Sequence, residues 1–280
     1  MAEEDNIIDF TARSSEGFFA KKILIEGDSW VSYPFPDAVN IATVLDGYST
    51  HDYLLLNLAS PGDNASSIFK SHGRQMKLLK RLLNIEQWGD AFDMILLSAA
   101  GNDIVGPEIV ERMYIRNKKD SPNVYGRELL TDSYYNVVAE IVRGYDRFLN
   151  MRDKSILNHL TPVITHVYSY LRPREVGVTI GPLTFTKGWI QRHLKHQGIR
   201  DEDEQVDVVE GMLDAFYNRL IKLQDKYNNF LVVDTRKVLC KDGMPDETMW
   251  HDEIHPNNRG FRKITQHIRS QSQAAGMWRL

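Results

Sequence analysis

Short apolar runs alternate with longer stretches of helical periodicity along most of this 280-residue chain. The apolar runs predict strands at residues 22–26, 53–59, 93–98, 162–168 and 229–234. The stretches between and after them predict helices at residues 37–45, 65–87, 131–157, 201–227 and 257–272. Strands that alternate with helices form a parallel sheet with helices on both faces. We therefore expect an α/β fold, a three-layer α/β/α sandwich around a central five-stranded parallel sheet.

Hydrophobic residues make up 42% of the chain, which is enough for a sizeable core in one large domain. We expect that domain to cover residues 1–280. Two segments exceed a minimal five-strand unit: residues 106–125 are polar and basic, and residues 169–200 are rich in Gly, Pro and aromatics. Both follow predicted strands, so we expect inserts that form a rim or lid over a site.

Ser29 directly follows the first predicted strand, within Gly27-Asp28-Ser29-Trp30. Ligands of open parallel sheets bind at the carboxyl ends of the strands, where this serine falls. Ser29 is therefore a candidate nucleophile, with helix capping as its alternative role. Asp28 is expected to accept backbone hydrogen bonds in the same turn.

Asp252 and His255 lie three residues apart near the C-terminus, so one turn of backbone can present both on the same side. An attacking serine hydroxyl loses its proton to an imidazole, and a carboxylate holds that imidazole in the required tautomer. Ser29, Asp252 and His255 thus form a candidate triad. No Gly-x-Ser-x-Gly occurs, so the turn is not the nucleophile elbow of an α/β-hydrolase.

Two further motifs follow predicted strands and supply candidate donors for an oxyanion. Gly62, in Ser60-Pro61-Gly62-Asp63, allows the backbone to approach a substrate closely. Asn102, in Gly101-Asn102-Asp103, carries a side-chain amide that can donate. With the amide of Ser29 they form a candidate three-donor oxyanion hole.

The motifs that hold Ser29, Gly62, Asn102 and the Asp252–His255 pair, in this order along the chain, resemble the four sequence blocks of the SGNH or GDSL-type hydrolases, and the resemblance spans residues 22–260. It implies a flavodoxin-like SGNH-hydrolase fold and a serine esterase or lipase that works through an acyl-enzyme without metal or organic cofactor. The implied partner is a small-molecule ester: a lipid, a short acyl ester or an acetylated carbohydrate. Trp30 stands where the commonest family pattern has leucine, which bears on pocket shape and not on the triad.

Aromatic and histidine side chains near the second insert are candidates for shaping the substrate site. They are His166, Tyr168, Tyr170 and Trp189, together with Trp30 beside the serine. Trp30 is also expected to pack beneath the site. For His166 the alternative is a histidine at a strand end whose hydrogen bonds are satisfied within the fold.

Two other classes of protein remain as alternatives. A metal-dependent phosphoesterase uses the residue types of Asp28, Asn102 and His255, but no Asp-x-His follows the first strand and the histidine spacings match no common metal pattern. We therefore predict no metal site. A non-catalytic binding module on the same fold is the second alternative; such proteins usually have a damaged triad, and here every motif residue is present.

Charge and the termini limit the partners. The net charge is −4 and the basic residues are scattered, so nucleic acid is not expected as a partner. No run approaches membrane-spanning length, and no signal peptide follows the acidic N-terminus. A single cysteine, Cys240, excludes an intramolecular disulfide. We expect a cytoplasmic protein without membrane insertion, with signal-independent export as the alternative.

Overall fold

The computed structural model describes residues 2–15, 21–33, 39–47, 53–84, 92–105, 114–177, 179–180, 183–184 and 188–278. Five strands of this part form one sheet in the order β2-β1-β3-β4-β7. Their bounds are β1 Lys21–Gly27, β2 Tyr53–Asn57, β3 Met94–Ser98, β4 Val163–His166 and β7 Phe230–Val233. All neighbouring pairs are parallel, which confirms the predicted five-stranded parallel sheet.

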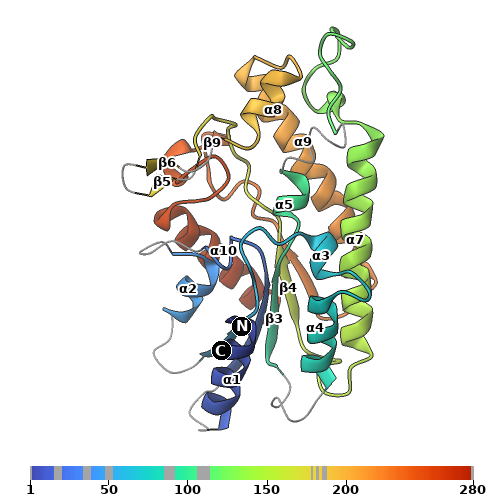
Figure 1. Cartoon of the computed structure of the whole chain (residues 1–280), viewed down its shortest axis with the longest axis vertical. Helices are drawn as coiled ribbons and strands as arrows, with labels where there is room; N and C mark the ends of the chain where they lie inside the picture. The colour runs from blue at the N-terminus through green and yellow to red at the C-terminus, as the bar shows by residue number, and fades with distance from the viewer. Residues whose placement is uncertain are drawn as a thin grey trace.

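The sheet is buried because helices cover it. The long helices are α1 Ala2–Ser15, α4 Arg74–Asn84, α7 Asp132–Asp153, α9 Glu202–Leu220 and α10 Asn258–Ala274. The short ones are α2 Ile41–Asp46, α3 Ala65–Ile68, α5 Gly101–Ile104 and α8 Gln191–His196. Figure 1 shows α2 and α10 on one side of the sheet and α3, α4 and α7 on the other. The predicted three-layer α/β/α architecture is confirmed.

The strand order creates a natural binding edge. From β1 the chain crosses to β2 on one side and then returns to β3 on the other, so the order reverses between β1 and β3. Ligands of doubly wound sheets bind beside such a reversal, at the carboxyl ends of the strands. The register pairs Gly27 with Ser98 at this edge, which brings the serine turn and the asparagine motif together.

The single helix predicted over residues 65–87 is wrong, because the chain forms α3 and α4 with a turn between them. Phe69 ends α3 with its side chain fully buried, 4.8 Å from the ring of Tyr145. Arg147 also donates to the carbonyl of Phe69, and the amide of Gly73 closes the turn onto Lys70 at 2.8 Å. These tertiary contacts override the helical periodicity of the sequence. Residues 85–87, the end of the predicted helix, lie outside the described part.

The other predicted helices differ mainly at their ends. The helix predicted over residues 37–45 begins only at Ile41, because Asn40 is extended and its side chain accepts from the amide of Thr43 in a capping box. Residues 37–38 lie outside the described part. Helix α7 ends at Asp153 rather than near residue 157, and α9 passes into a 3-10 helix, Ile221–Asp225.

Several elements escaped prediction. They are α1, α5, α8, the 3-10 helices Gly126–Leu129 and Glu247–Met249, and two antiparallel pairs of two-residue strands: β5 Thr179–Ile180 with β6 Leu183–Thr184, and β8 Cys240–Lys241 with β9 Met244–Pro245. Most are too short for a periodic pattern to develop. Helix α8 lies inside the second predicted insert, residues 169–200.

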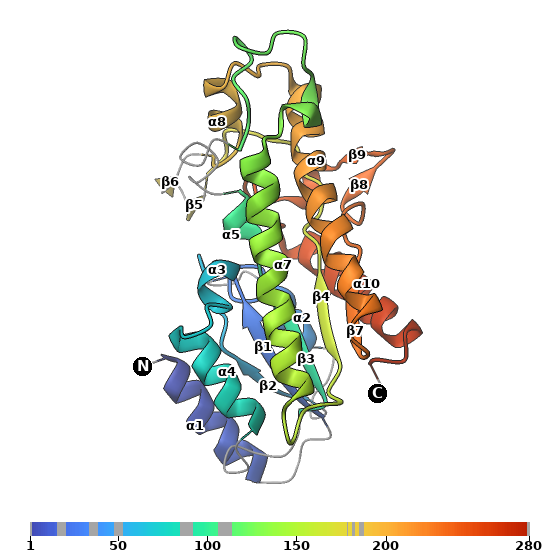
Figure 2. The same ribbon diagram turned by 90° about the vertical axis from the view of Figure 1, so that its right-hand side faces the viewer.

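The described parts of both inserts lie beyond the carboxyl ends of the strands, at the upper end of Figure 2. They contact each other: the amide of Lys118 donates to the carbonyl of Gln197 at 2.8 Å. The Lys118 ammonium lies 2.5 Å from Glu204 on α9. Residues 106–113 of the first insert lie outside the described part.

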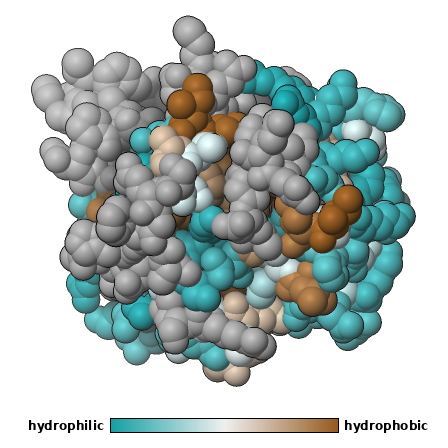
Figure 3. Space-filling view, turned by 90° about the horizontal axis from the view of Figure 1, so that it is seen from below, coloured by the Kyte–Doolittle hydropathy of each residue, from teal (hydrophilic) through white to brown (hydrophobic). Residues whose placement is uncertain are grey.

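Figure 3 views the opposite, lower end, where hydrophobic areas stand apart from one another among hydrophilic residues. The turn between α7 and β4 exposes Ile156 and Leu160, at 76% and 67%. Scattered exposed apolar residues are normal on a protein surface. Within the described ranges no helix combines the length and the apolar character needed to cross a bilayer.

Candidate active site

Ser29, His255 and Asp252 form one continuous hydrogen-bonded row. The Ser29 Oγ lies 2.8 Å from His255 Nε2, and His255 Nδ1 lies 2.9 Å from Asp252 Oδ2. Asp252 is fully buried, and burial alone would raise its pKa. The hydrogen bond and charge of His255, with two backbone amides, outweigh burial and hold the pKa of Asp252 below its usual value. This carboxyl group is therefore ionised at neutral pH.

Local structure explains the three-residue spacing of this acid and base. Asp252 Oδ1 accepts the backbone amides of Ile254 at 2.9 Å and His255 at 2.8 Å. The amide of His251 closes the loop by donating to the carbonyl of His255 at 2.8 Å. Asp252 thus builds the turn that aims the imidazole at its own carboxylate.

Tyr33 is a member of this row that the sequence did not reveal. Its hydroxyl donates to Asp252 Oδ2 at 3.1 Å, and its ring centroid lies 4.5 Å from that of His255. Burial, followed by the charge of Asp252, raises the pKa of Tyr33, so the hydroxyl keeps its proton and acts as a donor. Tyr33 therefore holds both the carboxylate and one face of the imidazole.

At the start of the turn that carries Ser29, only glycine fits. A Cβ on Gly27 would lie 2.2 Å from the carbonyl oxygen of Ser98. The Asp28 carboxylate then fixes the turn: it accepts the amide of Trp30 at 3.0 Å, the hydroxyl of Ser98 at 3.4 Å and the hydroxyl of Tyr168. These contacts fit the structural role expected for Asp28.

Asp28 should give stability a distinct pH dependence. Burial raises its pKa to about 6. In the unfolded chain the pKa is about 3.9. The folded state therefore binds more protons between these values, so this residue makes stability fall as pH rises from about 4 to about 6. We expect wild type to lose roughly 1 kcal/mol more than Asp28→Asn between pH 5 and pH 7 in urea unfolding. The same pH dependence in both proteins would contradict this assignment.

The glycine motif is hydrogen-bonded to the serine turn, and the asparagine motif is hydrogen-bonded to the glycine motif. The amide of Ser60 donates to the carbonyl of Gly27 at 3.2 Å, and the Asn102 Nδ2 donates to the carbonyl of Asp63 at 2.9 Å. Gly62 has φ +88°, a left-handed conformation that favours glycine. Since a side-chain amide carries two N–H donors, Asn102 retains one for another acceptor after its bond to Asp63.

The asparagine motif stands on a strained backbone. Ala100, directly before it, has φ +126°, a conformation that residues with a Cβ rarely adopt. The side chain of Asp103 accepts the amides of Ala65 at 2.6 Å and Ser66 at 3.2 Å, and thereby caps α3. Strain of this kind persists where surrounding contacts enforce it and is frequent at functional sites. Asp103 therefore has a structural role here.

The remaining candidates fall into two groups. Trp30 and Tyr168 line a pocket that lies beside Ser29 and is described below. The centroid of the Trp189 ring lies 5.8 Å from that of the His255 ring. His166 and Tyr170 are not among the lining residues of that pocket. Substrate contacts by all five residues stay predictions.

His166 and Tyr170 bond elsewhere. His166 is fully buried, and its Nε2 lies 3.0 Å from the Ser98 hydroxyl. Burial lowers the pKa of His166 to about 4, so the ring is neutral. The Tyr170 hydroxyl donates to Asp214 at 2.5 Å.

Glu253 is a second residue that the sequence did not single out. Its carboxylate accepts the amides of Ile190 and Gln191, both at 2.7 Å, and that of Arg174 at 3.1 Å. The Arg174 guanidinium also donates to the carbonyl of Asp252 at 3.0 Å. These bonds fasten the second insert to the loop of the candidate triad.

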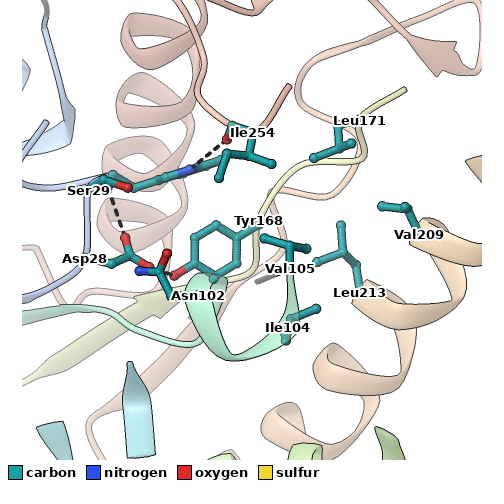
Figure 4. Close-up of a pocket in the computed structure, with 12 residues that line it drawn as sticks. Asp28, Ser29, Asn102, Ile104, Val105, Tyr168, Leu171, Val209, Leu213 and Ile254 are labelled. Atoms are coloured by element: carbon teal, nitrogen blue, oxygen red, sulfur yellow. Dashed lines mark hydrogen bonds between the residues drawn. The ribbon is translucent and has the colours of Figure 1, made fainter. Parts of the chain in front are cut away.

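A narrow pocket opens beside Ser29 (Figure 4). Its polar end holds Asp28, Ser29 and Asn102, and its remaining walls are almost entirely apolar. Trp30 forms part of the wall, and its indole Nε1 donates to the carbonyl of Ile254 at 3.2 Å. The other lining residues are Gly101, Ile104, Val105, Tyr168, Leu171, Val209, Leu213 and Ile254. Among the described residues, no three His, Cys, Asp or Glu side chains are grouped so as to hold a metal ion.

Solved structures of similar fold include three hydrolases. Lipase Lip_vut3 from a goat rumen metagenome is 15% identical, with a TM-score of 0.56 over 92% of this chain and 99% of that one. A carbohydrate acetylesterase family member from Sinorhizobium meliloti is 13% identical, with a TM-score of 0.51 over 91% and 98%. The acetylxylan esterase Axe2 from Geobacillus stearothermophilus, in a catalytic mutant, is 11% identical, with a TM-score of 0.50 over 90% and 93%.

No protein-family model and no curated protein matches the chain. At 11–15% identity the three structures establish a common fold. That fold agrees with the SGNH-type hydrolase fold predicted from the sequence.

Proposed function

We propose that this protein hydrolyses carboxylic esters through an acyl-enzyme, with Ser29 as nucleophile, His255 as general base and acid, and Asp252 as the orienting carboxylate. The observation that carries the proposal is the row of hydrogen bonds from the Ser29 Oγ through both imidazole nitrogens to Asp252. The likeness in fold to a lipase and to two proteins named as acetylesterases supports the same reaction class.

The row accounts for each proton. Asp252 accepts a hydrogen bond from the Nδ1–H of His255, and the unprotonated Nε2 lies 2.8 Å from the Ser29 hydroxyl. Nε2 takes the hydroxyl proton while Oγ bonds to the ester carbonyl carbon, and then gives that proton to the leaving alcohol. Water repeats the two steps on the acyl-enzyme and releases the acid. None of these steps requires a metal or an organic cofactor.

The oxyanion of each tetrahedral intermediate needs fixed donors. We assign them to the amides of Ser29 and Gly62 and to the second N–H of Asn102. The bond from Asn102 to Asp63 orients this side chain before substrate arrives. Donors that are already in place stabilise a developing charge without reorganisation, and each is worth about a hundredfold or more in rate.

Active-site labelling tests the proposal. A fluorophosphonate should attach one adduct, located on the Ser29 peptide by mass spectrometry, and should abolish p-nitrophenyl acetate hydrolysis in step with labelling. EDTA should leave hydrolysis unchanged. Hydrolysis that EDTA abolishes would favour the metal-dependent phosphoesterase, and an unlabelled, inactive protein would favour the binding module.

A further inference from the structure

Glu253 joins the second insert to the turn that carries the candidate acid and base. Its Oε1 accepts the amides of Gln191 at 2.7 Å and Arg174 at 3.1 Å, and its Oε2 accepts the amide of Ile190 at 2.7 Å. The backbone amide of Glu253 donates to the carbonyl of Val176 at 3.0 Å. Glu253 therefore holds two separate stretches of the insert against one turn.

The carboxylate of Glu253 lies in a site built from backbone. Its side chain is buried, with 1% exposed. The fit is close, since a Cβ on Gly188 would lie 3.0 Å from Glu253 Oε2 and 2.7 Å from the carbonyl oxygen of Arg174. Burial raises the pKa of Glu253, and the backbone amides that it accepts oppose the rise. Hydrogen bonds to a charged acceptor are about twice as strong as neutral ones, so this carboxylate is a strong anchor for the insert.

The anchored insert also reaches the candidate acid and base. The Arg174 guanidinium donates to the carbonyl of Asp252 at 3.0 Å. Trp189 directly precedes the two amides that Glu253 accepts, and its ring centroid lies 5.8 Å from that of His255. Asp252 is fully buried although it lies outside any helix or strand. The insert is thus in place beside both members of the pair.

We propose that Glu253 is a positioning residue for the candidate triad: by anchoring the second insert, it keeps Asp252 and His255 where proton transfer requires them. The inference rests on the proposed ester hydrolysis at Ser29. The His255 Nε2 lies 2.8 Å from the Ser29 Oγ, and a misplacement of about 1 Å can cost about a hundredfold in rate. Glu253 acts through these residues and does not itself touch the reacting atoms.

Glu253→Gln tests the proposal, because it keeps the size of the side chain. Both oxygens of Glu253 accept backbone amides, so the NH₂ group of glutamine faces an N–H donor whichever way it is turned. We expect kcat for p-nitrophenyl acetate to fall about tenfold, with KM changed by less than about twofold. The loss is partial because Trp30 and Tyr33 still hold the turn through Ile254 and Asp252.

Glu204→Gln is the matched control. Glu204 is 4% exposed, and it holds Lys118 of the first insert and the amide of Gly126 just after that insert. Loss of a buried carboxylate should destabilise both variants in urea unfolding. Only Glu253→Gln should lower kcat, because a purely structural role would affect stability alone.

A second pair of variants probes the same contact from the insert and decides the question if Glu253→Gln fails to fold. Arg174→Ala keeps the backbone amide that Glu253 accepts but removes the guanidinium from the carbonyl of Asp252. We expect kcat to fall about threefold. Arg172→Ala is the control, since its side chain is 22% exposed against 23% for Arg174 and pairs with Glu202. Its kcat should equal that of wild type.

Hydrogen exchange followed by mass spectrometry checks that the insert is released. Peptides that contain Ile190 and Gln191 should exchange faster in Glu253→Gln than in wild type, because their amides lose an acceptor. Unchanged exchange, unchanged kcat, or a raised KM alone would overturn the proposal; in the last case the insert would act on the substrate and not on the triad. A wild type that is neither active nor labelled at Ser29 would sink the proposed function and this inference together. An active wild type with an unaffected Glu253→Gln would sink the inference alone.

Discussion

Replacing Ser29 with alanine is expected to lower kcat for p-nitrophenyl butyrate by a factor on the order of 10⁵, with little change in KM. The alanine lacks the Oγ that forms the acyl bond, so neither His255 nor the oxyanion donors can compensate for it. Residual hydrolysis would come from those donors and from substrate binding. Steady-state kinetics on purified wild type and variant measure the loss.

The control for this prediction is Ser32→Ala, the same chemical change three residues along the chain. Ser32 interacts with the serine turn through its backbone, since its amide donates to the carbonyl of Asp28 at 3.1 Å. The substitution leaves that bond in place, and we expect activity near that of wild type. Substantial activity in Ser29→Ala, after contaminating esterases are excluded, would refute Ser29 as nucleophile.

Asp252→Asn is expected to lower kcat about 10⁴-fold, because it places the imidazole proton on the wrong nitrogen. The Oδ1 position accepts the amides of Ile254 and His255, so the oxygen of an asparagine must stay there. The new NH₂ group then takes the Oδ2 position, 2.9 Å from His255 Nδ1. Nδ1 becomes an acceptor, and the ring proton moves to Nε2.

A protonated Nε2 cannot accept the Ser29 proton. The expected loss of kcat therefore comes from the changed tautomer of His255 and not from a displaced side chain. Nitrogen NMR of the histidine ring distinguishes the two tautomers: we expect Nδ1–H in wild type and Nε2–H in the asparagine variant. Asp252→Ala is the comparison, since it removes the carboxylate without imposing a tautomer. An active Asp252→Asn with Nε2–H would show that His255 is not the base.

The sheet could be predicted because its strands are buried on both faces. A strand such as β3, with all five residues buried, is apolar at every position but its last, Ser98, and such a run is visible without any knowledge of its neighbours. Helix ends were predicted less well. Phe69 ends α3 because Tyr145 and Arg147 hold it from α7, more than 70 residues away in the chain.

The candidate triad was visible for a related reason. Asp252 and His255 meet within one turn, so their spacing alone indicates a pair, and Ser29 and Asn102 each stand shortly after the end of a strand of a parallel sheet. Candidate catalytic residues that lie a few positions apart, or that follow strands, can therefore be recognised from the sequence alone. The role of Tyr33 is not, because it arises from a contact with Asp252 across 219 positions.

The amino-acid sequence determined the layered fold, the edge at which a ligand would bind and the residue types available for acyl transfer, since all of these depend on local pattern. Only the tertiary structure decided which side chains surround them. Glu253 fastens the second insert through backbone amides, and Val209 and Leu213 close the pocket from α9. Side-chain packing between distant segments leaves no periodic trace, so the shape of the pocket had to come from the folded chain.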